Sequence, residues 1–132
     1  MTKRIKVAVG IVFNADKEVL VGQRVVKDQY FDKWEFPGGK LEPGETVEQA
    51  LTREFKEEVG ISLGATQRFM EVAHDYPDRQ VALFVRTASE YTGLVRSLEG
   101  QALKWVAVQE LSDLDFLQGN QVMIEKLINE YG

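Results

Sequence analysis

The sequence predicts one domain of the α/β (α+β) class, in which a mixed β-sheet carries helices on its faces. The 132 residues fit a single domain, taken here as residues 1–132, and suffice to bury a hydrophobic core. Strand and helix patterns follow one another in the order two strands, helix, three strands, helix. Apolar residues make up 44% of the chain and charged residues 28%, which is typical of globular rather than disordered proteins.

The first third of the chain predicts two strands and a shaped loop. Residues 6–14, KVAVGIVFN, are apolar and rich in β-branched side chains, so we expect a strand that is buried on both faces. Residues 18–24, EVLVGQR, follow a short turn and are expected to return as its hairpin partner. A polar loop covers residues 25–33. The glycines and prolines of residues 34–45 then predict a short strand that leads into a shaped loop.

A helix is predicted over residues 47–59 because signals for its start, its body and its end occur together. Thr46 and Gln49 form a capping-box pattern at the start. Gly60 supplies a stop after the last helical residue.

The second half of the chain predicts three more strands, a helical turn and a final helix. The strands are expected over residues 66–76, 80–90 and 102–108, the turn over 109–116 and the helix over 119–132. Asn120 stands where its side chain could cap the final helix.

Composition excludes several classes of function. The net charge of −5 argues against bulk binding to nucleic acid or to anionic membranes, although a small anionic substrate can still bind beside a cation. The absence of cysteine excludes disulfides, thiolate catalysis and zinc–thiolate sites. No segment approaches the roughly 20 apolar residues of a membrane helix. We therefore expect a cytoplasmic protein without a signal peptide. A monomer is taken as the expected oligomeric state.

Three carboxylates, those of Glu54, Glu57 and Glu58, are crowded on the predicted helix. Like charges three or four positions apart destabilise a helix by about 0.2–0.5 kcal/mol per pair. A helical wheel places all three on the continuation of the apolar side, opposite Thr52 and Lys56, although acidic runs on helices are usually solvated. Sheltered carboxylates must be protonated or share a cation. Oxygen ligands without Cys or His favour Mg²⁺, with Mn²⁺ as its substitute.

The loop before this helix adds chemistry that suits a phosphate group. Gly38 and Gly39 allow the backbone to approach a ligand closely, and Lys40 beside them is a candidate phosphate contact. The loop is not a Walker loop, because the G-x-x-x-x-G-K-[ST] pattern is absent.

These residues together resemble the signature of the Nudix hydrolase family, the Nudix box G-x5-E-x7-R-E-U-x-E-E-x-G-U, in which U is bulky and apolar. The stretch GKLEPGETVEQALTREFKEEVGI fills every fixed position of that signature. The matching residues are Gly39, Glu45, Arg53, Glu54, Phe55, Glu57, Glu58, Gly60 and Ile61.

Further segments resemble the branch of MutT-type 8-oxo-dGTP diphosphatases. They are AVGIV, WEFPGGK, YPDR, EGQ with a later KW, and DF with a later Asn. The resemblance implies a Nudix α/β/α sandwich and Mg²⁺-dependent cleavage of a nucleoside triphosphate into monophosphate and pyrophosphate. Gln29 and Trp34 depart from that branch near the expected base pocket, so they could broaden or shift base preference.

The resemblance also implies roles for individual residues. The Mg²⁺ ligands would be the Gly38 carbonyl and the carboxylates of Glu54, Glu57, Glu58 and Glu99. Glu54 is the leading general base and Glu99 its rival, while Arg53 orients a carboxylate of the box through a charge-assisted pair. Glu45 is expected to support the junction of loop and helix. His74, which has no partners for a triad or a zinc site, is expected to be structural.

The substrate is expected to contact residues outside the acidic helix. Arg24 and Lys40 are phosphate candidates, although a strand-end arginine is often only solvated. Phe36, Asp78, Arg79 and Asn120 would surround the base, and Glu35 would anchor the loop. The Asn120 amide offers both a donor and an acceptor, which matches the O6 and N7–H edge of 8-oxoguanine.

Three functions stay open from the sequence. The first is hydrolysis of 8-oxo-dGTP, which would cleanse the nucleotide pool and prevent mutation. The second is hydrolysis of CTP or of a broad range of nucleoside triphosphates. The third is a Nudix-fold binding module without catalysis, which the complete set of box carboxylates disfavours.

Overall fold

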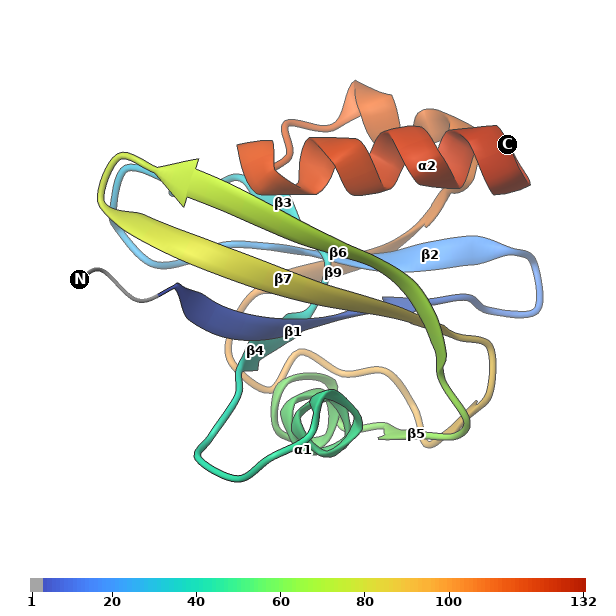
Figure 1. The fold of residues 1–132 in the computed structure, drawn as a ribbon. Coiled ribbons are helices and arrows are strands. Elements are labelled where there is room, and N and C mark those ends of the chain that lie inside the picture. Colours follow the sequence, from blue (N-terminus) through green and yellow to red (C-terminus); the bar gives the residue numbers. More distant parts are fainter. Residues whose placement is uncertain (1–3) are drawn as a thin grey trace.

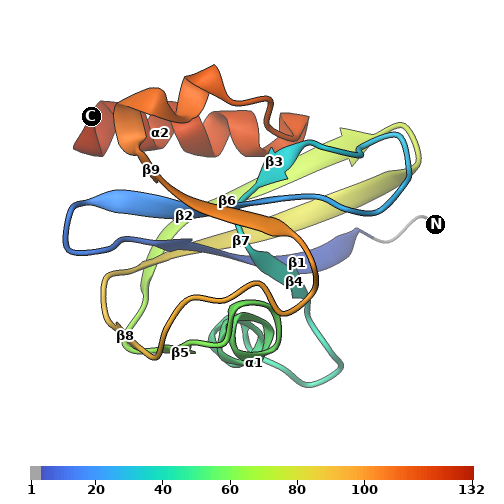
Figure 2. The ribbon, with the colours of Figure 1, turned by 180° about the vertical axis from the view of Figure 1, so that it is seen from behind.

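Two helices lie on opposite sides of a central layer of strands in the computed structural model, which describes residues 4–132. α1 (Val47–Val59) covers one side and α2 (Gln121–Tyr131) covers the other, as the two opposite views show (Figure 1, Figure 2). This is the mixed α/β sandwich that the sequence predicts. No helix in the described part of the chain is long and apolar enough to cross a membrane.

The strands form two main sheets and one small sheet. The larger sheet has the order β4-β1-β7-β6, the second has the order β3-β2-β9, and β5 pairs with β8. β1 and β7 run parallel, whereas every other pair of these strands is antiparallel. The strands are β1 (Ile5–Val12), β2 (Glu18–Gln23), β3 (Trp34–Glu35), β4 (Gly38–Lys40), β5 (Ser62–Leu63), β6 (Gln67–Tyr76), β7 (Arg79–Ala88), β8 (Tyr91–Thr92) and β9 (Ala102–Ala107).

The predicted hairpin between β1 and β2 is wrong. A single bridge joins Phe13 to Val19, and the two strands then enter different sheets. The side chain of Asn14 does form a turn, because its Oδ1 accepts hydrogen bonds from the backbone of Asp16 and Glu18. Both edges of β1 are already taken by β4 and β7, so β2 pairs with β9 instead.

α1 begins and ends where the sequence predicts. Thr46 and Gln49 form the reciprocal capping box, with side-chain to backbone bonds of 3.1 and 2.9 Å. Gly60 ends the helix at φ 73°, a left-handed conformation that glycine adopts at little cost. The ring of Phe55 packs directly over the backbone of Gly10, so a side chain on that strand residue would collide with it.

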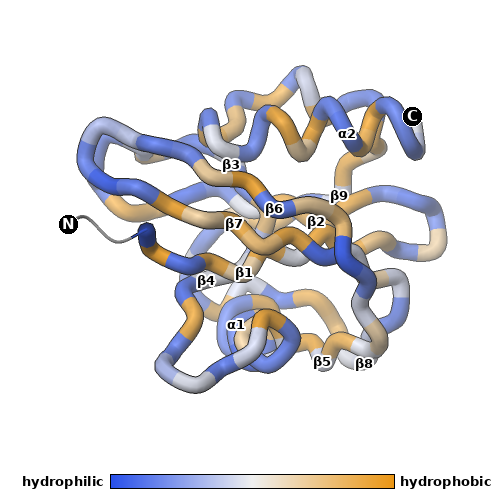
Figure 3. Tube along the Cα trace, in the orientation of Figure 1, coloured by the Kyte–Doolittle hydropathy of each residue, from blue (hydrophilic) through white to orange (hydrophobic). Residues whose placement is uncertain are grey.

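The core has two halves, one on each side of the strands. Alternate residues of β1 point to opposite sides, so Val9 and Ile11 pack with the α2 half, and Ala8 and Val12 pack with the α1 half. The hydropathy of the chain follows this arrangement, with apolar segments toward the strand layer and polar segments outside (Figure 3). The C-terminal five residues of β1 are buried as predicted, whereas its first residues are partly exposed.

Two 3-10 helices precede α2. η1 (Val108–Asp113) corresponds to the predicted helical turn, and η2 (Gln118–Asn120) leads into the final helix. The alternative role of Asn120, a side-chain cap for α2, is not adopted, since the side chain makes no capping bond and the backbone is helical at φ −89° and ψ −9°. That side chain is turned into the protein, where it accepts a hydrogen bond from the Phe36 backbone.

Candidate active site

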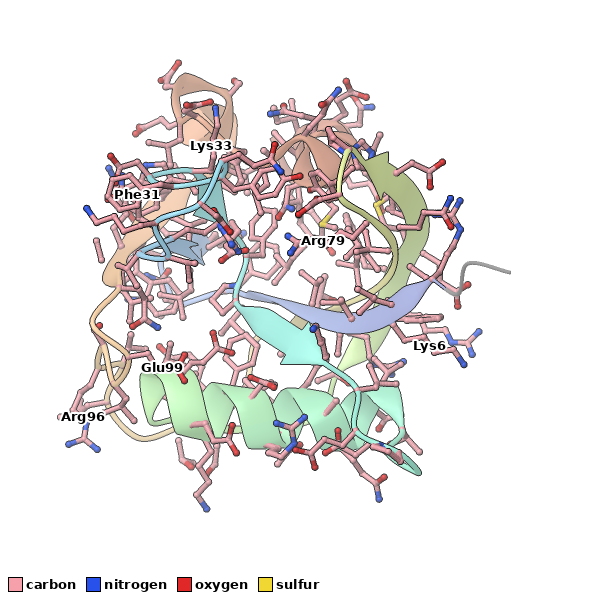
Figure 4. The ribbon with its side chains drawn as sticks, turned by 90° about the vertical axis from the view of Figure 1, so that its left-hand side faces the viewer. Lys6, Phe31, Lys33, Arg79, Arg96 and Glu99 are labelled. Atoms are coloured by element: carbon pink, nitrogen blue, oxygen red, sulfur yellow. The ribbon has the colours of Figure 1, made fainter. Side chains whose placement is uncertain are left out.

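Two adjacent cavities lie beside the loop that follows β3. The first has a volume of about 220 Å³ and is lined by apolar residues of β1 and β7, with Asn120 and Phe36 among its walls. The second has a volume of about 130 Å³ and is lined by Glu58, Glu99 and both residues of the Val25–Val26 pair. Arg24 and Glu35 line both cavities. Figure 4 shows this end of the molecule, with Glu99 beside the C-terminal end of α1 and Arg79 farther from that helix.

Arg53 binds the carboxylates of both Glu45 and Glu54. Its Nε and Nη2 donate to the two oxygens of Glu45 at 2.7 and 2.9 Å, in a bidentate pair. Its Nη1 donates to Glu54 at 2.8 Å, and its Nη2 also reaches the backbone oxygen of Lys40 at 3.1 Å. Hydrogen bonding to Arg53 lowers the pKa of the Glu45 carboxyl to about 2. One guanidinium therefore ties the loop of β4 to the acidic face of α1.

Glu58 is the most strongly perturbed acid of the site. Burial, followed by its hydrogen bond with Glu54 and repulsion from Glu54, Glu99 and Glu35, raises the pKa of the Glu58 carboxyl to about 9. Its Oε2 is buried without a hydrogen-bond partner. A buried oxygen in this state is suited to a proton or to a metal ion, because both remove the unpaired charge.

Glu57 lies apart from the other box carboxylates. Its side chain is 55% exposed, and its contact with Arg53 is long, at 3.5 Å. The wheel prediction that all three glutamates face inward is therefore wrong for this one. Leu51, Phe55 and Val59 set the centre of the buried face, and at about 100° per residue Glu57 lies roughly 160° from that centre.

The glycines of the loop hold the backbone close to its neighbours. A Cβ on Gly38 would collide with the backbone oxygen of Ala8, and a Cβ on Gly39 would collide with the carboxylate of Glu54. β4 pairs with β1 here, with Val9 opposite Gly38 and Ala8 opposite Gly39. Gly38 therefore allows β4 to lie close against β1, and Gly39 allows the main chain to reach the carboxylate of Glu54.

Glu99 is carried by a loop that is bonded to the end of α1. The backbone of Leu98 donates to the carbonyl of Glu58 at 3.0 Å. Gln101 donates to the same carbonyl at 3.4 Å and accepts from the backbone of Glu99 at 3.1 Å. Ser97 donates to both the backbone oxygen and the side-chain oxygen of Gln101. These contacts keep Glu99 beside Glu58 although 41 positions separate the two along the chain.

The donor set fits a hard divalent cation. It consists of the predicted carboxylate ligands and the backbone carbonyl of Gly38. It includes the Oε2 of Glu58, which has no hydrogen-bond partner. Within residues 4–132, no three histidine, aspartate or glutamate side chains are already gathered into a metal-ligand group. Glu54 also forms an ion pair with Arg53, at 2.8 Å.

The first cavity has one polar group deep in its wall. Asn120 is 6% exposed, and among the described residues no other side chain that carries an amide or a charge is buried to this degree. Its Oδ1 accepts a hydrogen bond from the Phe36 backbone at 3.2 Å, which fixes the oxygen of the amide on the side of Phe36. The ring of Phe36 packs on Phe116, with centroids 5.3 Å apart. Asn120 is thus fixed in place by the same loop that supplies the wall of the cavity.

The predicted substrate residues divide into two groups. Arg24, Glu35, Phe36, Lys40, Arg79 and Asn120 all line the first cavity. Asp78 does not; its carboxylate is on the exposed β6–β7 turn and accepts a hydrogen bond from Tyr30 at 2.7 Å. Burial raises the pKa of the Glu35 carboxyl, and Arg24, 3.6 Å away, acts in the opposite direction.

Residue-by-residue prediction missed two tyrosines. Tyr76 lines the first cavity, and its hydroxyl accepts from the backbone of Gly119 at 2.9 Å, next to Asn120. Tyr30 is 8% exposed inside a loop that was predicted to be merely polar. A signal existed for Tyr76, which begins the YPDR segment. None existed for Tyr30, since its partners are far away in the sequence.

Comparison with known proteins gives a consistent result. Residues 3–127 match the NUDIX domain model. The 8-oxo-dGTP diphosphatase of Escherichia coli is 37% identical over 125 residues, which cover 95% of this chain and 97% of that protein. The CTP pyrophosphohydrolase of the same organism is 32% identical, over 82% of this chain and 79% of that one.

The fold is shared as well. A solved structure from a study of MutT from Aliivibrio salmonicida and Vibrio cholerae superimposes with a TM-score of 0.84. The two sequences are 33% identical, and the match covers 98% of this chain and all of the other.

Proposed function

The chain belongs to the NUDIX domain family and is a Nudix hydrolase of the MutT kind, and from this premise we propose that it hydrolyses 8-oxo-dGTP. The products would be 8-oxo-dGMP and pyrophosphate, and the reaction would remove an oxidised precursor from the nucleotide pool. The whole chain, residues 1–132, would act as one domain. The observation that carries this proposal is the buried amide of Asn120 in the wall of a cavity adjacent to the box carboxylates.

Asn120 supports recognition of an oxidised purine. Its Nδ2 can donate to O6, and the second lone pair of its Oδ1 can accept from the N7–H that 8-oxoguanine has and guanine lacks. Since the Phe36 N–H already holds the Oδ1, the amide cannot turn over without losing that bond. Guanine would leave the buried oxygen facing the bare N7 acceptor, which is costly because neither acceptor gains a hydrogen bond.

The two cavities share Arg24 and Glu35 in their walls, which supports a triphosphate that extends from the first cavity into the second. A base beside Asn120 would direct its phosphates past Arg24 toward Glu58 and Glu99. Arg24, Arg79 and Lys40 supply positive charge in the first cavity. That charge would offset the phosphate oxygens before they reach the carboxylates.

A Mg²⁺ ion is expected to bind between the phosphates and the acidic end of α1. The Gly38 carbonyl and the carboxylates of Glu54, Glu57, Glu58 and Glu99 would hold it. When bound it would supply Lewis-acid stabilisation of the phosphate charge.

Glu54 is the proposed general base. Arg53 donates to one of its oxygens, Oε1, and the side chain lies against Gly39, so the oxygen that does not bind Arg53 is the one proposed to accept a proton from water. Glu99 remains the alternative base, because it lines the second cavity and its loop is fixed to α1. Replacement of each residue by Gln, with kcat measured against pH, distinguishes the two: the base is the residue whose loss removes the acidic limb of the profile.

A substrate panel tests the proposal directly. The values of kcat/KM are measured for 8-oxo-dGTP, dGTP and CTP, and the products are identified as monophosphate and pyrophosphate. A preference for 8-oxo-dGTP of at least about tenfold over dGTP supports it. A higher value for CTP would favour the second candidate, which the 32% identical CTP pyrophosphohydrolase supports. No pyrophosphate from any nucleotide would favour a binding module.

A further inference from the structure

Tyr30 lies at the centre of a cluster of charged side chains behind the first cavity. It belongs to the loop between β2 and β3, yet its side chain is buried. The guanidinium carbon of Arg24 lies 5.8 Å from the centre of its ring, and that of Arg79 lies 5.2 Å from it. Both distances are within the range of a cation–π contact. One aromatic ring therefore contacts two arginines, of which Arg24 directly follows β2 and Arg79 begins β7.

Tyr30 is itself held at several points. Its hydroxyl donates to Asp78 at 2.7 Å, and its backbone nitrogen donates to Asp28 at 2.9 Å. Its ring packs edge-on against Tyr76 at 5.2 Å. Burial, and then the bond to Asp78, raises the pKa of the Tyr30 hydroxyl to about 12, so it stays a donor at neutral pH. The loop of β2–β3 is thus attached to the β6–β7 turn through this residue.

The two arginines have unused donors. The Nε of Arg24 and the Nε of Arg79 are both buried without a hydrogen-bond partner. Both side chains line the first cavity, whereas Tyr30 does not. Buried cationic N–H groups without partners are costly unless a ligand accepts from them. The phosphate oxygens of a nucleotide are acceptors with the complementary charge.

We propose that Tyr30 is a positioning residue that holds Arg24 and Arg79 together as one binding site for the anionic oxygens of the nucleotide. The ring fixes the direction of both guanidinium groups, and the hydroxyl fixes the ring to the opposite turn. Tyr30 touches no substrate atom, so it acts on binding and not on the chemical step. The inference rests on the proposed nucleotide substrate, but not on the identity of its base.

A double-mutant cycle tests this role. Tyr30→Leu, Arg79→Ala and the double variant are compared with the unmodified protein, using whichever nucleotide of the panel is hydrolysed fastest. We expect Tyr30→Leu to raise KM about tenfold and to change kcat less than about threefold. In the Arg79→Ala background the increase in KM caused by Tyr30→Leu should shrink to about threefold or less, because one of the two arginines that Tyr30 positions is absent. A full tenfold effect in that background overturns the proposal.

Two further variants separate positioning from folding. Tyr30→Phe keeps the ring and removes only the hydroxyl, so it should raise KM about two- to fivefold and lower the melting temperature by only about 3–5 °C, which leaves the protein folded in the assay. Tyr131→Phe is the matched control, since this tyrosine is exposed on α2 and should leave KM unaltered. An unaltered KM in Tyr30→Phe together with additive losses in the cycle shows a purely structural residue.

The test can fail separately from the proposed function. If CTP has the highest kcat/KM of the panel, 8-oxo-dGTP is rejected as the preferred substrate, but the double-mutant cycle can still be measured with CTP. If no nucleotide is hydrolysed, calorimetric titration with inorganic pyrophosphate yields the same cycle as dissociation constants. Absence of pyrophosphate binding by the unmodified protein then overturns the inference.

Discussion

Replacement of Asn120 by alanine should lower both substrate selectivity and stability, for two distinct reasons. In the proposed complex the amide makes two hydrogen bonds to 8-oxoguanine, each worth about 1–1.5 kcal/mol. Their loss, about 2–3 kcal/mol, corresponds to a fall of about 30- to 150-fold in kcat/KM for 8-oxo-dGTP. Guanine can use only the bond to O6, so dGTP should lose about 5- to 13-fold. The preference for 8-oxo-dGTP should therefore decline by about 5- to 13-fold.

The stability effect comes from the Phe36 backbone. Its N–H donates to the Asn120 Oδ1 at 3.2 Å and would be left buried without an acceptor. Since this bond is long, we expect a loss of about 1 kcal/mol and a melting temperature lower by about 3–5 °C. Circular dichroism measures the melting, and kinetics are then recorded well below it, so that unfolding does not affect the rates.

The matched control is Val122→Ala, in the first turn of the same helix. Val122 is 42% exposed, so its replacement should change neither selectivity nor melting by a measurable amount. If Asn120→Ala melts earlier as expected but keeps the selectivity within about twofold of the unmodified protein, Asn120 does not read the base.

Three other perturbations have expected outcomes. Glu45→Gln should destabilise the protein at pH 7 and pH 5 but have little effect near pH 2. Arg53 lowers the pKa of Glu45 to about 2, so the stability that the charged carboxylate contributes is lost as pH falls through that value. Urea unfolding at several pH values checks this, and a difference that persists at pH 2 contradicts it. Gly39→Ala should displace the Glu54 carboxylate and lower kcat at least about tenfold, with melting nearly unchanged; a normal kcat would show that Glu54 can move freely. Removal of metal with EDTA should abolish hydrolysis. Glu58→Gln should raise the Mg²⁺ concentration that gives the half-maximal rate at least about tenfold. If that concentration is unchanged, Glu58 is not a metal ligand.

The parts of the fold that depend on local signals could be predicted from the sequence. The helix over residues 47–59 has its capping box, its buried stripe and its glycine stop within 15 positions, so its bounds were predicted correctly. The strands of the 67–88 hairpin likewise followed from alternation and a short turn. The pairing of β1 could not be predicted, since its partners β4 and β7 are distant and compete with the nearby β2.

The candidate site shows the same division. The box residues could be identified from the sequence because their pattern is contiguous, but the solvent exposure of each side chain could not be predicted from it. Glu57 seemed equivalent to its neighbour Glu58 until Phe55 and Val59 fixed the direction of the buried face. Asn120 occupied a helix start, and only contact with Phe36, 84 positions away, decided against a capping role.

The parallel pairing of β1 with β7 has a consequence for how activity is acquired during folding. It joins residues 5–12 to residues 81–88, so a loop of about 70 residues must close before the pair can form. β4, which carries Gly38 and Gly39, is paired with β1 on its other edge. On a ribosome, the β1–β4 pair therefore lacks β7 beside it until the chain as far as Ala88 has emerged. The helix with the box carboxylates can form much earlier, but hydrolysis should return only with the slowest step of refolding.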